Sequence, residues 1–208
     1  MNHQEDMDQD GMDKNDMDQN VLTTPLDADE RAFLRALAWR AVGAAVRDEA
    51  APDPEAVARE QGLPLSARLQ ELRGAFVTLH AGGHLRGCIG TIEGRRPLTL
   101  AVADNGAAAA VSDPRFPPVT PDELSNLTLE VSVLTPLRAV DGPAGIEVGR
   151  HGILLDKQGR QAVFLPQVAT EQGWDLPTTL THLCRKAGLP PDAWREGARL
   201  RVFEAEVF

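Results

Sequence analysis

Two stretches of the chain pair strand patterns across a turn of only two or three residues. "AFVTLH" and "HLRGCIGTI" flank the turn "AGG" within residues 75–92, and residues 149–166 turn at Gln158–Gly159. Turns this short join antiparallel neighbours. The pattern therefore predicts a mostly antiparallel or mixed sheet. A three-residue turn in the first hairpin places His80 opposite His84.

Helical patterns alternate with these hairpins. An apolar stripe with helical spacing begins after Asp27, and Glu30 stands where a capping box requires an acid. Pro97 opens a second helix rich in small residues, and a third helix ends at Gly188. The segment "LTLEVSVL" (127–134) alternates as a half-buried strand, and the C-terminal "LRVFEAEVF" has strand chemistry. Interspersed helices and hairpins predict the α+β class.

The charge of the chain is concentrated at its N-terminus. Residues 1–20 hold seven acids and one base, so −6 of the formal charge of −10 lies there and −4 lies in the rest. Residues 1–24 are too acidic and too poor in apolar bulk to fold, which predicts a disordered tail before one folded domain at 25–208. A folded part with this balance is a poor partner for nucleic acid, which binds clustered bases.

The sequence argues against a membrane-spanning segment and against a disulfide framework. No apolar run approaches the ~18 residues that span a bilayer, so no membrane association is expected. The two cysteines lie far apart and form no CxxC motif, which favours a reducing cytoplasm over a disulfide framework.

The stretch "LRGCIG" (85–90) is the leading candidate for chemistry. In a regular strand Arg86 and Cys88 share a face, about 6.6 Å apart along the strand. A guanidinium that close favours the thiolate and raises its reactivity. Gly87 and Gly90 leave the backbone open to a ligand. The alternative interpretation is a small buried cysteine in a strand whose glycines mark a bulge.

Four further residues are candidates for the same site. Asp113 and Arg115, in "SDPRF", lie on a proline-rich loop, where Arg115 can join Arg86 in holding a carboxylate or phosphate and Asp113 can instead cap its own turn. Glu130 is a candidate general base if it shares a cleft with Cys88, and otherwise belongs to a solvated strand face. His151 titrates in the range that proton transfer needs, although a histidine in a glycine-rich turn is more often structural.

Metal and cofactor motifs are not found in the sequence. His84 lies four residues from Cys88, about 13 Å along a strand, which is too far for a shared ion. The sequence has no phosphate-loop, serine-elbow or HExxH pattern. The expectation is therefore no metal site and no cofactor.

Taken together, six stretches in this order resemble the AMMECR domain family, whose bacterial and archaeal members are called protein A of the AmmeMemoRadiSam system. The resemblance runs from about Leu26 to Phe208 and is carried by "LRGCIG", "DPRFPPVTPDEL", "LEVSVL", "GRHGI", "FLPQVA" and "HLCRKAGL". It implies two α/β subdomains, one larger and one smaller, with a cleft between them. It also implies that the cysteine motif is the family's signature, to which no reaction is attached.

Three functional hypotheses follow. The first is an enzyme, or an accessory subunit of one, in which Cys88 is the nucleophile or a ligand-contacting group and Arg86 holds an anion. The second is a non-catalytic scaffold that docks a Memo-like protein or a radical S-adenosylmethionine protein, since the resemblance implies these partners. The third, modification of RNA, conflicts with the acidic charge balance.

Overall fold

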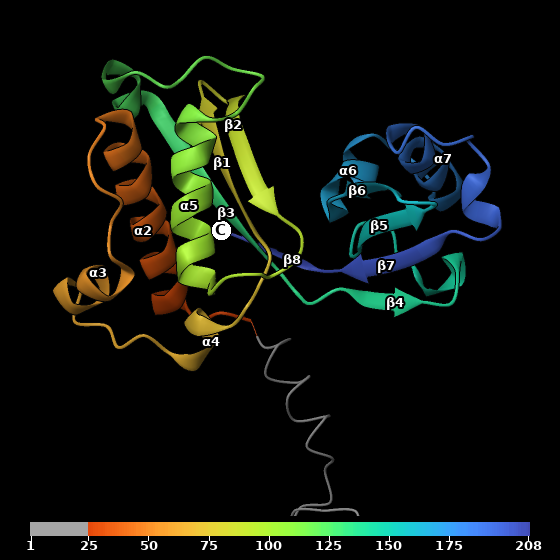
Figure 1. Ribbon diagram of the computed structural model, residues 1–208, viewed down its shortest axis with the longest axis horizontal. Helices are drawn as coiled ribbons and strands as arrows, with labels where there is room; N and C mark the ends of the chain where they lie inside the picture. Colours follow the sequence, from red (N-terminus) through yellow and green to blue (C-terminus); the bar gives the residue numbers. More distant parts are fainter. Residues whose placement is uncertain (1–24) are drawn as a thin grey trace, which may run out of the picture. The chain divides into compact units, whose positions relative to one another are not determined.

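The computed structural model describes residues 25–208, so the predicted disordered tail lies outside the described residues. The chain divides into two compact units, one running through Val131 and including Phe208, the other comprising residues 132–207. Each unit combines helices with antiparallel strand pairs, and the predicted α+β class is confirmed (Figure 1).

The first unit carries α-helices, a 3-10 helix and most of a four-stranded sheet with the order β2-β1-β3-β8. Its helical elements are α2 (Ala28–Val46), α3 (Pro54–Glu60), α4 (Ala67–Gln70), α5 (Leu98–Val111) and the 3-10 helix η1 (Pro121–Asn126). The strands of this sheet are β1 (Ala75–Ala81), β2 (His84–Thr91), β3 (Leu127–Leu134) and β8 (Ala205–Val207).

Helix α2 begins as the sequence predicts. The Asp27 side chain accepts a hydrogen bond from the Glu30 backbone N–H, and the Glu30 side chain accepts one from the Asp27 N–H, which completes the capping box. The apolar stripe of α2 is buried against α5, and α5 in turn packs on β1 and β2 (Figure 1). The small residues of α5 permit this close approach on both sides.

The first hairpin has a different register from the one that the sequence predicts. Ala81 pairs with His84 across the two-residue turn Gly82–Gly83, and both glycines have positive φ, 57° and 80°. His80 therefore lies opposite Leu85, not opposite His84. Paired positive φ values are typical of the tight turn that matches strand twist, and "GG" satisfies it without a third loop residue.

The second unit is built around a four-stranded sheet with the order β4-β7-β5-β6. Its strands are β4 (Arg138–Val140), β5 (Gly152–Lys157), β6 (Arg160–Phe164) and β7 (Arg199–Phe203). Its helices are α6 (Pro166–Glu171), α7 (Leu176–Lys186) and the 3-10 helices η2 (Pro143–Gly145) and η3 (Ala193–Arg195). The β5–β6 hairpin turns at Gln158–Gly159 as predicted, with φ of 54° and 77°.

Helix α7 supplies the core of the second unit. Leu180, Leu183 and Cys184 are fully buried and pack against Leu155 and Val202 of the sheet. Gly188, with φ of 69°, follows the end of this helix, as the sequence predicts. Within the described part of the chain, no helix combines the length and hydrophobicity that a bilayer crossing requires.

Candidate functional site

Strand β2 lies at the edge of the first sheet, and a loop covers that edge at Cys88. The Cys88 backbone N–H donates to Asp113 Oδ2 at 2.8 Å, and the Cys88 carbonyl accepts from Arg115 Nη2 at 3.3 Å. Both backbone groups of Cys88 are therefore directed away from β1. The loop that follows α5 takes the place that a further strand would otherwise fill.

Asp113 and Arg115 form a short-range ion pair that supports this arrangement. Arg115 donates to Asp113 through Nε at 3.0 Å and Nη2 at 2.7 Å, and its backbone N–H adds a bond to Oδ1 at 3.1 Å. The Asp113 side chain is only 2% exposed. The Arg115 hydrogen bond, followed by backbone donors that include Cys88, holds the pKa of Asp113 well below its usual range although burial opposes it.

The Cys88 side chain is half-buried and faces polar groups. Thr78 is the residue opposite Cys88 in the hairpin, and its hydroxyl donates to Cys88 Sγ at 3.3 Å. The Arg115 side chain is 54% exposed. The pKa of Arg115 is raised, first by its hydrogen bond to Asp113 and to a smaller extent by Cys88. The guanidinium beside Cys88 is thus that of Arg115.

The Arg86 guanidinium is engaged elsewhere. The pairing passes from Leu79 opposite Gly87 to His80 opposite Leu85, so Arg86 is the extra residue of a β-bulge. Its Nε and Nη2 donate to the two Glu123 carboxylate oxygens at 2.8 and 3.1 Å. Arg86 Nη1 and Nη2 also donate to the carbonyls of Pro117 and Pro118. This bidentate pair fixes the loop of residues 117–123 against β2.

Glu123 joins the bulge to the start of η1. Its carboxylate accepts from the Thr120 backbone N–H at 2.8 Å and from the Thr120 hydroxyl at 3.1 Å. Hydrogen bonding by Arg86, with help from Thr120, lowers the pKa of Glu123 to about 2. Glu123 thus remains ionised over the physiological range and keeps Arg86 in place.

The two glycines of "LRGCIG" are accounted for by packing. A Cβ at Gly87 would overlap the carbonyl oxygen of Ala109 in α5, so glycine lets the helix backbone meet the strand. A Cβ at Gly90 would overlap the ring of Phe76, its partner in the register. The space that a side chain would need is therefore taken by a helix at Gly87 and by a phenyl ring at Gly90. The role of the two glycines in ligand binding stays a prediction.

Two predicted site residues, Glu130 and His151, lie on elements that do not pair with β2. Glu130 lies on β3, which β1 separates from β2, and two strand spacings amount to about 10 Å. His151 belongs to the second unit, where its Nδ1 accepts from the Glu147 backbone N–H at 3.0 Å. Burial is the main cause that lowers the pKa of His151. Their catalytic roles stay predictions.

Sequence analysis did not single out Thr78 or Glu123. Thr78 follows from the register of the hairpin, once the turn is assigned two residues and the bulge is placed at Arg86. Glu123 carries one local signal, since Thr120 and Glu123 have the spacing of a capping box. Across residues 25–208, no three His, Cys, Asp or Glu side chains gather closely enough to hold a metal ion.

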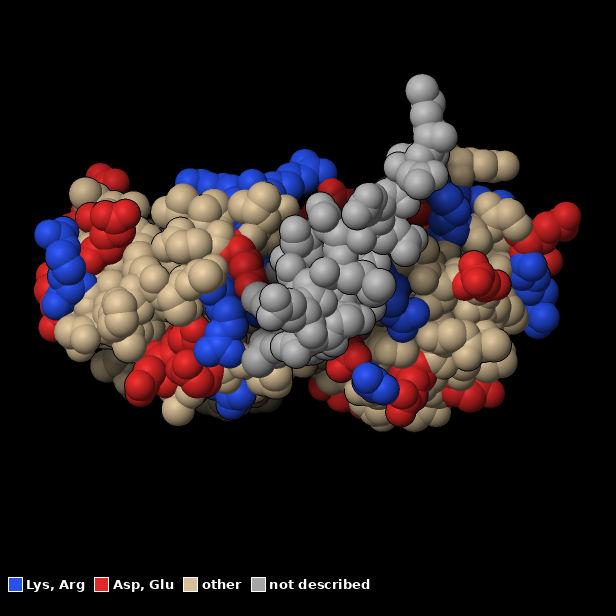
Figure 2. Space-filling model, turned by 90° about the horizontal axis from the view of Figure 1, so that it is seen from below, with Lys and Arg blue, Asp and Glu red and all other residues tan. Residues whose placement is uncertain are grey.

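The surface charge bears on the predicted classes of partner. In Figure 2, acidic and basic side chains are interspersed over the visible face of the described residues. Several arginines are paired with carboxylates, among them Arg40 with Glu60 and Arg150 with Glu204. Such pairing leaves fewer cations for phosphate contacts.

The chain is similar to known proteins over most of its described residues. The AMMECR1 family model matches residues 35–208. Protein Mbar_A1807 of Methanosarcina barkeri is 41% identical over 187 residues, covering 88% of this chain and 90% of its own, and Protein MK0488 of Methanopyrus kandleri is 47% identical over 155 residues, covering 70% and 75%.

A solved structure agrees with this assignment. The crystal structure of the uncharacterized protein PH0010 from Pyrococcus horikoshii aligns with a TM-score of 0.74 at 39% identity, covering 84% of this chain and 88% of that one. Fold, family model and relatives all extend over both units. The chain belongs to the AMMECR1 family.

Proposed function

We propose that this protein binds an anionic ligand at Cys88, with the thiol in contact with the ligand and the Arg115 guanidinium as the anion contact. The protein then acts as an enzyme, or as the accessory subunit of one, through this site. A single observation carries the proposal. The Asp113–Arg115 pair fixes the Cys88 backbone from outside the sheet, while Cys88 itself is only partly buried, with its thiol beside a hydroxyl and a guanidinium.

The contacts separate the motif residues that shape the strand from Cys88, the residue proposed to contact the ligand. Arg86, Gly87 and Gly90 contact Glu123, Ala109 and Phe76, and these contacts shape the strand. The Cys88 side chain, in contrast, contacts the Thr78 hydroxyl and lies beside the Arg115 guanidinium. The Arg115 side chain is 54% exposed, so its remaining donor capacity is accessible to a ligand.

The test compares two alkylating reagents on the folded protein. Iodoacetate carries a negative charge and iodoacetamide is neutral, so their rate ratio at Cys88 measures how strongly the site attracts an anion. We expect Cys88 to react and fully buried Cys184 to stay unmodified. The rate with iodoacetate divided by the rate with iodoacetamide should fall several-fold in Arg115→Gln. The matched control is Arg95→Gln, an 82% exposed arginine, which should leave the ratio unchanged. Equal ratios in the wild type and Arg115→Gln, or an unreactive Cys88, contradict the proposal.

A docking function is the second candidate, and the packing of the glycines favours it. Both glycines of the motif serve close approach of neighbouring groups, as a purely structural motif requires. In this case the chain holds a Memo-like or radical S-adenosylmethionine partner, and the thiol is dispensable. If Cys88→Ala co-purifies with such partners as well as the wild type does, the result supports docking. If Cys88→Ala no longer binds them, the result supports the thiol site.

A further inference from the structure

A pocket of about 600 Å³ lies within the second unit, at the point where β4 and β7 separate. The two strands pair only from Arg138 to Val140 on one side and from Leu200 to Val202 on the other. Beyond these pairs the chain turns away at Gly142 and Gly197, with φ of 139° and 66°. The volume is in the range of small-molecule sites, about 300–1,000 Å³.

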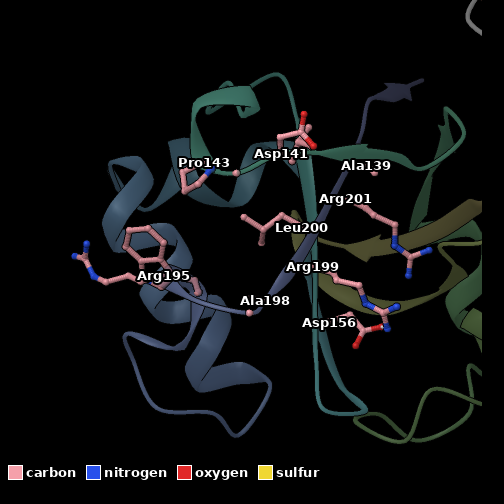
Figure 3. Close-up of a pocket in the computed structure, with 13 residues that line it drawn as sticks. Ala139, Asp141, Pro143, Asp156, Arg195, Ala198, Arg199, Leu200 and Arg201 are labelled. Carbon is pink, nitrogen blue, oxygen red and sulfur yellow. The ribbon is translucent and has the colours of Figure 1, made fainter.

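The floor of the pocket is apolar. Val140, Pro143, Trp194 and Ala198 line it, Leu200 lies buried beneath at 4% exposure, and Val140, Trp194 and Ala198 pack on the core. Figure 3 shows Leu200 in the centre, with Pro143 and Asp141 on one side of it and Ala198 on the other. An apolar body of a ligand can therefore replace water on this floor.

The rim of the pocket is cationic on balance. Three arginines line it (Arg195, Arg199 and Arg201) against two acids (Asp141 and Asp156). Figure 3 shows Arg199 and Arg201 extending to one side and Arg195 to the other. Arg199 is engaged with Asp156, since its Nη2 lies 2.9 Å from Asp156 Oδ2.

Arg195 differs from the other two arginines in its partners. Its guanidinium carbon lies 4.3 Å from the centre of the Trp194 ring, which is a cation–π contact. Among the carboxylates of residues 25–208, none forms an ion pair with it. A contact with the face of the ring leaves the N–H donors of the guanidinium available for an anion.

We propose that this pocket binds a small organic anion with an apolar body, in which the body rests on Val140, Pro143 and Trp194 and the acidic group contacts Arg195. The geometry combines a concave apolar floor with a guanidinium at its edge that forms no ion pair with any carboxylate of residues 25–208. This site is independent of the thiol site, because every residue that lines it belongs to residues 139–201.

Titration of the full chain with octanoate, followed by NMR, tests the proposal. Octanol and octylamine have the same apolar body with a neutral and a cationic head. We expect octanoate to shift the Trp194 indole N–H and the Gly142 and Gly197 amides saturably. Octanol should bind at least about 5-fold more weakly, and octylamine should produce no saturable shift.

Substitutions assign the anion contact. Arg195→Gln, at an exposed position, should weaken octanoate binding about 5- to 10-fold and leave octanol binding unchanged. The matched control Arg185→Gln, an exposed arginine on α7, should change neither, and Cys88→Ser should bind octanoate normally. The proposal is overturned if octanoate and octylamine shift the same signals equally, if no shift saturates, or if Arg195→Gln retains full affinity for octanoate.

Discussion

The Asp113 carboxylate accepts a hydrogen bond from the Cys88 backbone N–H at 2.8 Å, although the two residues are 25 positions apart. Arg115 completes the contact from the same loop by donating to the Cys88 carbonyl. An unpaired strand edge exposes its N–H and C=O groups to water or to other chains. In this protein the loop satisfies both groups at one residue, and that residue is Cys88, whose thiol is the leading candidate for chemistry.

Removing the Asp113 carboxylate should loosen the edge strand at Cys88. Asp113→Ala leaves a backbone N–H and a guanidinium without their acceptor, which should lower the free energy of unfolding by about 1–3 kcal/mol. Asp113→Asn retains an acceptor oxygen and should lose less. Urea unfolding measures the stability, and hydrogen exchange of the Cys88 amide reports the local effect. A Cys88 amide that exchanges equally slowly in Asp113→Ala would show that the contact is not needed.

The contact between β2 and α5 should not tolerate a side chain at Gly87. In Gly87→Ala the new methyl group meets the Ala109 carbonyl oxygen, which belongs to helix backbone and cannot rotate away. We expect a loss of about 1–3 kcal/mol in the free energy of unfolding, measured by the urea midpoint. Gly83→Asn is the control, because asparagine accepts the positive φ of 80° in the turn and nothing lies within 4 Å of its Cβ. Equal stability of the two variants would contradict the packing argument.

Local patterns predicted the elements well because each pattern has a local cause. The capping box at Asp27 and Glu30, the "QG" turn and the helix end at Gly188 all depend on residues within a few positions of one another. The strand predicted at "LTLEVSVL" matches β3 (Leu127–Leu134) for the same reason, but the alternation of burial stops halfway, because Ser132 on the second face is also buried. These features establish the α+β class without knowledge of distant contacts.

The site was harder to predict because its contacts are long-range. A strict alternation along β2 places Arg86 beside Cys88, but the bulge at Arg86 breaks the period, and its guanidinium meets Glu123, 37 positions away. The sequence predicts Arg115 as an anion contact. Its bond to the Cys88 carbonyl, however, depends on where the loop after α5 meets the sheet edge. No spacing in the sequence specifies that meeting point.

The Arg86–Glu123 pair should make stability depend on pH in acid. Hydrogen bonding lowers the pKa of Glu123 to about 2 from its ordinary 4.5. The contribution is therefore complete above about pH 4.5 and is lost as the pH falls from there toward 2. In urea unfolding between pH 6 and pH 2.5, the stability advantage of the wild type over Glu123→Gln should shrink in this window. Glu171→Gln, at an exposed position on α6, should show no such change, and a constant difference between the wild type and Glu123→Gln would contradict the pairing.

His151 should make the stability of the protein depend on pH nearer to neutrality. Burial lowers the pKa of this imidazole, and Nδ1 accepts the Glu147 N–H, so the folded protein holds the neutral form. Its stabilising contribution is complete above about pH 6.5 and decreases as the pH falls below that value, because the unfolded chain takes up the proton first. The Glu147 amide signal should move with the imidazole when His151 is protonated in an NMR titration.

The charges around His151 provide the matched test of this prediction. Arg138 and Arg150 lower the pKa of His151, whereas Glu204 and Glu147 raise it. Arg138→Gln removes one opposing positive charge and should raise the pKa. A charge-neutralising change at Arg185, on α7, should leave the pKa of His151 unchanged, since Arg185 is not among the groups that act on His151. If Arg138→Gln lowers the pKa of His151 or leaves it unaltered, these neighbouring charges do not control the protonation of His151. The pH dependence of the Glu147–His151 turn would then have another cause.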